Sequence, residues 1–337
     1  MILRSFRSAG AVALFALSLS LLSASAQQQV PAAPPQDSTA VPAAPAAPAP
    51  TAAPTFPKPD PANFTAAAPS KDAINAFLQA SWGYDTNRVW QIQAIMKTPA
   101  DGVSKVVVLV GDKSGKQKSG ALAFFAMPDG KHIVAGDEVL PFGEHPYADY
   151  RAQVQQGADG PYRGSAAKDL ELVEFADFQC PHCKEAQANM DKLATDFPKA
   201  RIVFQNYPLA AIHPASVKAA QYAVCVTKLG GSGAFFQFAS AVFDGQEGLA
   251  TPDGTDLTLN SAVTKAGVDT AKVKTCIAAP ETTTQVESSV KLAQALNINQ
   301  TPTLVVNGRQ VPIGGVPYET LKQIVEYQAK LDGVAAQ

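Results

Sequence analysis

The chain has 337 residues, a formal net charge of -2 and a hydrophobic content of 46%. The chain is nearly neutral, with a pI of about 6.1, and it lacks the strong positive charge that favours binding to nucleic acid or anionic lipid. We therefore expect no nucleic-acid partner. The hydrophobic content is sufficient for buried cores, and the length suggests two domains.

The first 26 residues have the pattern of a secretory signal peptide. Arg4 and Arg7 precede an apolar run over residues 9–22, and small residues follow at 24–26. The run is shorter than the roughly 20 apolar residues that a membrane-spanning helix needs. We therefore expect residues 1–26 to be removed and the mature protein to be periplasmic or otherwise extracytoplasmic, and soluble.

Residues 27–70 consist mainly of Pro, Ala, Thr and Gln, with few large apolar side chains. Such a composition cannot bury enough surface to offset the entropy of ordering the chain. Alternating Pro and Ala favours extended segments. We expect a disordered linker over this stretch.

Residues 71–150 predict a small α+β domain. Apolar residues at helical spacing follow Ser70, a good N-cap residue, and predict a helix. Three β-rich runs come next, at residues 103–112, 120–127 and 131–142, and the last two are joined by a turn with Asp129-Gly130, which predicts a hairpin.

The remaining residues, about 165–332, predict an α/β domain that begins after a Gly- and Ser-containing connector. Strand, helix and strand are followed by a helical stretch over about 210–296, then by a hairpin at Asn307-Gly308 and a closing helix. This order is that of a thioredoxin-like fold with a helical insertion.

The sequence "DFQCPHCKEA" places Cys180 and Cys183 three residues apart, where the first strand of this domain meets its first helix. A crosslink over so short a loop restricts the unfolded chain only weakly, which argues against a purely structural role. A zinc site needs further ligands, and Cys225 and Cys276 each lack a partner at short spacing. We therefore expect a redox pair, with no metal and no cofactor.

The expected position of Cys180 at a helix N-terminus assigns the two thiols different roles. The helix dipole and free N–H groups there favour the thiolate and lower its pKa. Pro181 begins the first helical turn, and His182 can stabilise the thiolate further. We expect Cys180 to be the exposed nucleophile and Cys183 the buried resolving thiol.

Cys225 and Cys276 both lie on predicted helices of the insertion. In an exported chain they are expected to form a structural disulfide, which closes a loop of about 50 residues and contributes about 4 kcal/mol in the chain-entropy model. A second redox relay and two free thiols are the alternatives.

Three more residues fit redox chemistry. Thr301-Pro302 begins a strand, where a cis-proline could present its backbone to a substrate, although an ordinary trans proline is the alternative. Glu174 lies in the strand before Cys180. If buried, its carboxyl has a raised pKa and could move protons for Cys183; if it lies at an exposed edge, it has no such role.

Residues 165–332 resemble the DsbA family of extracytoplasmic thiol-disulfide oxidoreductases, through "VEFADFQCPHC", the insertion helices and "ALNINQTPTLVVNGRQVPIGG". The resemblance implies that Cys180 is the nucleophile, Cys183 the resolving thiol, Glu174 a buried acid and Pro302 a cis-proline. Thr301 stands where the best-known oxidase of the family has valine. Threonine there is also found in the dimeric DsbC and DsbG isomerases.

The hairpin "AMPDGKHIVAGDEVLPFG" resembles the end of the N-terminal dimerisation domain of those isomerases. We therefore expect an exported thiol-disulfide oxidoreductase whose partners are unfolded or partly folded exported proteins with thiols and a membrane redox protein. A homodimeric isomerase or reductase that uses residues 71–150 is an alternative. A binding module with a thioredoxin fold and no catalysis is another.

Overall fold

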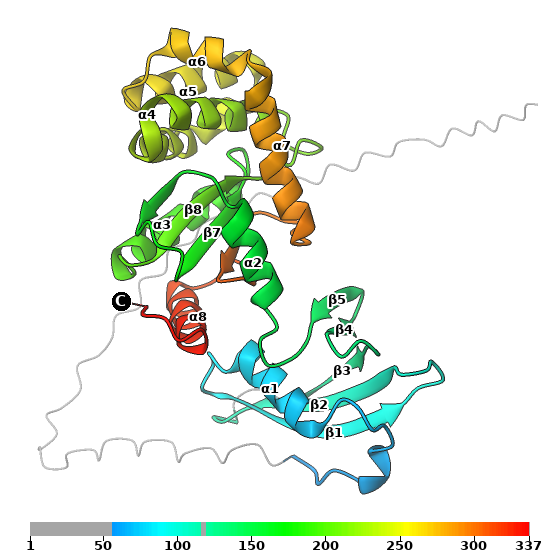
Figure 1. The fold of residues 1–337 in the computed structure, drawn as a ribbon. Coiled ribbons are helices and arrows are strands. Elements are labelled where there is room, and N and C mark those ends of the chain that lie inside the picture. Colours follow the sequence, from blue (N-terminus) through cyan, green and yellow to red (C-terminus); the bar gives the residue numbers. More distant parts are fainter. Residues whose placement is uncertain (1–55, 116–118, 337) are drawn as a thin grey trace, which may run out of the picture. The chain divides into compact units, whose positions relative to one another are not determined.

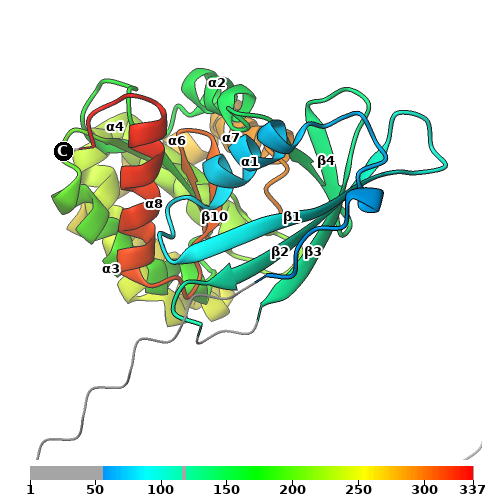
Figure 2. The ribbon, with the colours of Figure 1, turned by 90° about the horizontal axis from the view of Figure 1, so that it is seen from below.

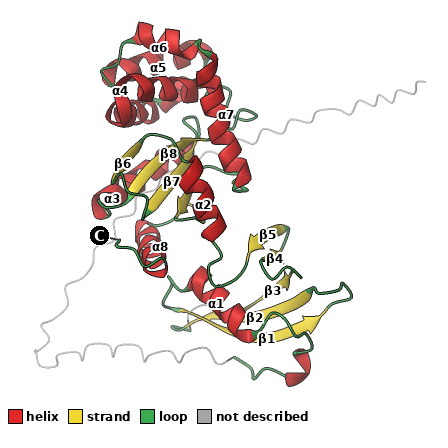
Figure 3. Ribbon diagram, in the orientation of Figure 1, coloured by secondary structure: helices red, strands yellow, loops and turns green. Residues whose placement is uncertain are grey.

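The computed structural model of the protein describes residues 56–115 and 119–336. The expected signal peptide, and the expected linker as far as residue 55, lie outside the described residues. Two five-stranded sheets and several helices make up the described part (Figures 1 and 3). In this part of the chain, no helix is both long and apolar enough to span a membrane.

The first sheet is antiparallel, and its strands follow chain order. Its elements are α1 (Lys71–Trp82), β1 (Arg88–Lys97), β2 (Ser104–Asp112), β3 (Gly120–Ala126), β4 (His132–Ala135) and β5 (Glu138–Pro141). The expected hairpin across Asp129-Gly130 joins β3 to β4. Sequence reasoning missed β1, because a register shift between Ile92 and Ala94 interrupts the two-residue alternation that identifies a strand.

Helix α1 begins where expected, since the Ser70 side chain accepts a hydrogen bond from the Ala73 N–H. Ile74 and Leu78, one turn apart, are fully buried against the sheet, and Figure 2 shows α1 lying along it. Phe64 forms a bridge with Ile95 of β1. The end of the expected linker therefore packs on the sheet, because Phe64 supplies apolar surface that the preceding Pro-Ala tract lacks.

The second sheet has the strand order β10-β9-β7-β8-β6. Its strands are β6 (Tyr162–Gly164), β7 (Glu171–Ala176), β8 (Arg201–Asn206), β9 (Thr303–Val306) and β10 (Arg309–Pro312). The helices around it are α2 (Ala148–Gly157), α3 (Pro181–Asp196) and α8 (Tyr318–Leu331). Strands β7 and β8 are parallel, whereas β9 is antiparallel to β7. The stretch expected to be a connector contains the end of α2 and the short edge strand β6.

The central strand β7 is buried on both faces, as its near-continuous apolar sequence predicts. Leu172 packs with residues of α3 and α8, and the next residue, Val173, packs with residues of α2 and α7 (Pro280–Ala295) on the other face. The active-site turn therefore follows a strand held by a core on each side.

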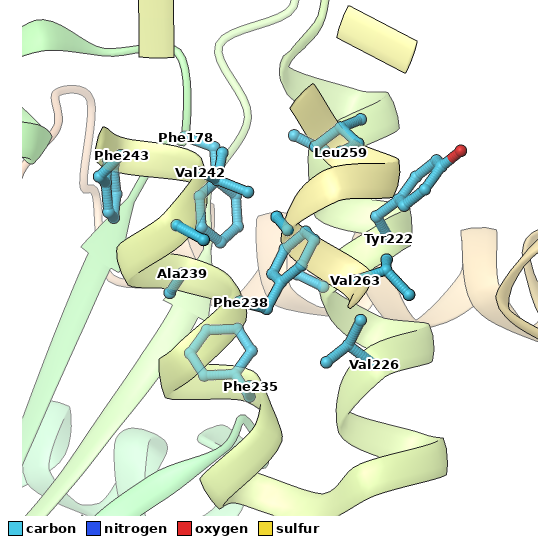
Figure 4. Close-up of a cluster of buried hydrophobic side chains, with 14 of the residues drawn as sticks. Phe178, Tyr222, Val226, Phe235, Phe238, Ala239, Val242, Phe243, Leu259 and Val263 are labelled. Atoms are coloured by element: carbon cyan, nitrogen blue, oxygen red, sulfur yellow. The ribbon is translucent and has the colours of Figure 1, made fainter. Parts of the chain in front are cut away.

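Helices α4 (Ser216–Asp244), α5 (Pro252–Lys265), α6 (Thr270–Ile277) and α7, with the 3₁₀ helix η2 (Gln246–Ala250), form the insertion between β8 and β9. Gly231, with a φ of 74°, interrupts α4, so the two helices expected here join at a kink. Their shared core contains Phe235 and Phe238 (Figure 4). Together these elements confirm the expected α/β class, a thioredoxin-like fold with a helical insertion after a small α+β region.

Candidate active site

The Cys180 residue occupies the N-cap position of α3, and Pro181 occupies the first helical position. Proline suits that position because its fixed φ fits the helix and its missing N–H would have no helical partner. The Cys180 carbonyl accepts hydrogen bonds from the N–H groups of Cys183, at 3.1 Å, and Lys184, at 3.3 Å. The first turn of α3 thus places both cysteines on one side of the strand end.

Cys180 is only 5% exposed, so the expectation of an exposed nucleophile is wrong for this conformation. The physical reason is the loop before β9, where the Thr301-Pro302 peptide bond is cis and the Thr301 carbonyl lies 3.6 Å from Cys180 Sγ. Cys183 is fully buried. Both cysteines of this pair are free thiols in the structure.

The two thiols have opposite acidities. A hydrogen bond from Cys183 lowers the pKa of Cys180 to about 5, and the Thr301 side chain and the backbone N–H groups of Cys183 and His182 assist. These donors outweigh burial, which by itself favours the neutral thiol. Burial raises the pKa of Cys183, and the adjacent Cys180 raises it further. One sulfur is thus suited to be a thiolate and the other to hold a proton.

Glu174 faces the core between β7 and α3, so the exposed-edge alternative for this residue is wrong. Its side chain is 3% exposed, and burial raises its pKa to about 7. The Gln187 amide on α3 donates to Glu174 Oε1 at 2.8 Å and to the Cys183 carbonyl at 3.1 Å. Gln187 therefore links the buried carboxyl to the main chain of Cys183.

His182 points into solvent, with 66% of its side chain exposed. Its Nδ1 lies 3.0 Å from Glu185 Oε2, and this hydrogen bond raises the pKa of His182. The His182 backbone N–H helps to lower the pKa of Cys180, and the Cys180 thiolate in turn raises the pKa of the His182 ring, as the expected support of the thiolate by this side chain requires. The Glu185 contact, not considered from the sequence, thus favours the protonated form of His182.

Sequence reasoning missed Asp177, the first residue after β7. Its backbone N–H donates to Cys183 Sγ at 3.4 Å. Its buried carboxylate accepts hydrogen bonds from the Gln179 and Leu209 N–H groups, both at 2.8 Å, and contacts His213 Nδ1 at 2.8 Å. A carboxylate just before a Cys-x-x-Cys pair was the available signal.

The other two cysteines are joined in the insertion. Cys225 on α4 and Cys276 on α6 form a disulfide with an S–S distance of 2.07 Å across a sequence separation of 51. The Thr282 hydroxyl lies 3.5 Å from Cys225 Sγ. The disulfide ties α6 to α4, whose side chains surround the active-site turn.

Within residues 56–115 and 119–336, no group of three or more His, Cys, Asp or Glu side chains is placed to hold a metal ion. The Cys180-Cys183 pair has a carboxylate near it, in Asp177, but that group is already occupied by three donors.

A central sheet, a Cys-Pro-His-Cys turn at a helix N-terminus and a cis-proline loop facing it define a thioredoxin-fold protein with a dithiol site. The thioredoxin family model matches residues 157–327, just over half of the chain, and the chain belongs to this family. The match includes both cysteines, Glu174 and the cis-proline loop.

Among solved structures, a thioredoxin-like oxidoreductase from Silicibacter pomeroyi is 27% identical, with a TM-score of 0.45, covering 53% of this chain and 98% of that one. ScsC from Proteus mirabilis is 23% identical, with a TM-score of 0.46, covering 55% and 81%. Among curated proteins, the Na(+)/H(+) antiporter NhaA 3 of Salinispora tropica is 27% identical over 148 residues, 44% of this chain. The chain spans only 22% of that antiporter's length.

Proposed function

We propose that this protein is an exported thiol-disulfide oxidoreductase that forms or exchanges disulfides in other proteins through Cys180. The observation that carries the proposal is the difference in acidity between the two thiols: the pKa of Cys180 is lowered to about 5, and that of Cys183 is raised. A thiolate is both the better nucleophile and the better leaving group, so exchange is directed to Cys180.

The oxidising reaction begins with the Cys180-Cys183 disulfide. A client thiolate attacks Cys180 Sγ, the bond between the two cysteines breaks, and its electron pair goes to Cys183, which takes up a proton. A second client thiolate then attacks the client sulfur of the mixed disulfide and releases Cys180 as a thiolate. Two client thiols become one disulfide, and the cysteine pair is reduced by two electrons. A membrane redox protein would reoxidise it.

Residues around the two thiols support separate roles in these reaction steps. Glu174, with a pKa of about 7, is a buried carboxyl that can exchange protons near neutral pH, and we propose that it serves the protonation of Cys183. The cis peptide at Thr301-Pro302 places backbone beside Cys180, where a client chain would bind. The clients are unfolded or partly folded exported proteins that carry thiols.

Trapping tests the assignment. Cys183→Ala should accumulate mixed disulfides at Cys180, because the resolving thiol is absent, and a reducing agent should release the clients. Cys180→Ser should abolish both trapping and the oxidation of a reduced model peptide. Oxidation of that peptide by Cys180→Ser at the wild-type rate would refute the assignment. Sequencing of the mature N-terminus should show that residues 1–26 have been removed.

An isomerase is the second candidate, favoured by Thr301 before the cis-proline and by the antiparallel sheet over residues 88–141. An isomerase needs the reduced Cys180 thiolate to attack scrambled disulfides. Light scattering and refolding of scrambled ribonuclease separate the two. A dimer that restores ribonuclease activity favours the isomerase, and a monomer that oxidises reduced substrates favours the oxidase.

A further inference from the structure

The active-site turn is bonded to the helical insertion through the side chain of Gln246. This residue begins η2, just after α4. Its Nε2 group donates to the Phe178 carbonyl at 2.8 Å and to the Cys180 carbonyl at 2.9 Å. One amide thus uses its two N–H bonds on two carbonyls of the turn that carries the reactive thiol.

Side chains of the active-site segment also bond to the insertion. Gln179 Nε2 donates to the Leu249 carbonyl of η2 at 3.2 Å, and Gln179 Oε1 accepts from the Ala215 N–H at 2.8 Å. Lys184, in the first turn of α3, forms an ion pair with Glu247 at 2.9 Å. Three consecutive parts of the active-site segment are therefore held by η2 and the start of α4.

The η2 segment is itself held firmly by α5. A Cβ atom at Gly248 would lie 2.1 Å from the Thr258 hydroxyl oxygen, so only glycine permits this close approach. The Thr255 hydroxyl donates to the Leu249 carbonyl at 3.3 Å. The packing of η2 against α5 therefore determines where the Gln246 side chain lies.

Apolar packing also connects the active-site turn to the helical insertion. Phe178, whose carbonyl is one of the two that Gln246 binds, is 1% exposed. Its ring stacks on Phe204 of β8 at 5.2 Å and meets Phe238 and Phe243 of α4 at 5.8 and 5.2 Å (Figure 4). Burial fixes the turn's place in the core, but it does not orient the carbonyls, because apolar packing is not directional.

The orientation of these carbonyls matters for the thiol. The Cys180 carbonyl and the N–H groups of His182 and Cys183 belong to the same first turn of α3, and those N–H groups stabilise the Cys180 thiolate. Rotation of the Cys180 backbone would therefore move Sγ away from its donors.

We propose that Gln246 is a positioning residue: it holds the Cys180 backbone so that the thiolate faces the helix N-terminus, and it thereby couples the docking of the helical insertion to the reactivity of the site. The inference rests on the proposed thiol-disulfide function, and it adds a residue outside the thioredoxin core to that function. Gln246 acts on the thiol through the Phe178 and Cys180 carbonyls that its amide binds.

The test is Gln246→Met, which keeps the length of the side chain and removes its donors. Gln221→Met is the matched control, because the Gln221 amide on α4 donates to the Thr283 hydroxyl, at 3.2 Å and near solvent, away from the active-site turn. In Gln246→Met we expect the pKa of Cys180 to rise by about one unit, and the disulfide's equilibrium constant with glutathione to shift about tenfold toward the oxidised protein, about 30 mV in reduction potential. Gln221→Met should match the wild type in both.

Thiolate absorbance, the glutathione equilibrium and urea unfolding are measured on all variants. A folded Gln246→Met protein with the wild-type pKa and equilibrium constant would overturn the inference, as would equal shifts in Gln221→Met. If Gln246→Met does not fold, Gln179→Met removes the turn's own hydrogen bonds to Leu249 and Ala215 of the insertion, and it must shift both quantities in the same direction. If the wild type shows neither a low thiolate pKa nor exchange, the proposed function itself fails.

Discussion

The replacement Glu174→Gln tests the buried carboxyl beneath the active site. Glutamine keeps the shape of the side chain and an oxygen for the Gln187 amide, but it cannot ionise. Burial raises the pKa of Glu174 from 4.5 to about 7 in the folded protein. Below both values the carboxyl is protonated in the folded and the unfolded chain, so it contributes no pH dependence there.

Between pH 4.5 and about 7, the unfolded chain loses this proton while the folded protein keeps it. The wild type should therefore lose stability as the pH rises through this interval, and the loss should level off above pH 7. A difference of 2.5 pKa units corresponds to about 3 kcal/mol at 1.36 kcal/mol per unit. The free energy of unfolding of Glu174→Gln should lack this loss.

Urea unfolding across this pH range, with Cys180 and Cys183 kept reduced, measures the difference. Glu287→Gln, which removes an exposed carboxylate on α7, is the control and should run parallel to the wild type. Parallel profiles for Glu174→Gln and the wild type would refute the reasoning. The rate of disulfide exchange provides a second readout, since an inflection near pH 7 should be present in the wild type and absent in Glu174→Gln.

Three further outcomes are expected. The thiolate absorbance of reduced protein should titrate with a midpoint near pH 5, and this signal should vanish in Cys180→Ser; a midpoint above pH 8 would contradict the site geometry. Replacing both Cys225 and Cys276 by alanine should lower the free energy of unfolding by about 4 kcal/mol, from the loop that the disulfide closes, and leave Cys180 reactive; an unchanged urea midpoint would count against a structural role. Asp177→Asn replaces one carboxylate oxygen by an amide group that donates, and it therefore faces the backbone N–H donors of Gln179 and Leu209. We expect the free energy of unfolding in urea to fall by about 1 to 3 kcal/mol. An unchanged free energy of unfolding would show that the loop at Leu209 rearranges without cost.

The second domain could be predicted from the sequence because its elements carry strong local signals. The mostly apolar strand before Cys180, the helical spacing after it and the Asn307-Gly308 turn each agree with the element that forms. The strands β1 and β6 were missed for a physical reason. A register shift breaks the alternation of β1, and β6 is a three-residue edge strand that forms only because β8 lies beside it.

In the active site, too, some features follow from local sequence and others from long-range contacts. Cys180 at a helix N-terminus follows from the order of strand and helix alone. Gln246 lies 66 residues from Cys180 in the chain, and the intervening helices carry no local sign that its amide meets the turn. His213 likewise reaches Asp177 from a sequence distance of 36 residues.

Local sequence therefore determined the reactive pair and its position between a buried strand and a helix, since hydrophobic periodicity and helix-starting residues act over a few positions. The tertiary structure decided how that pair is surrounded. Packing covers Cys180 with the loop at Thr301-Pro302, buries Glu174 so that its pKa rises, and places Gln246 against the turn. Burial and long-range hydrogen bonds arise only when distant segments meet, and in this protein they set the acidity on which its chemistry depends.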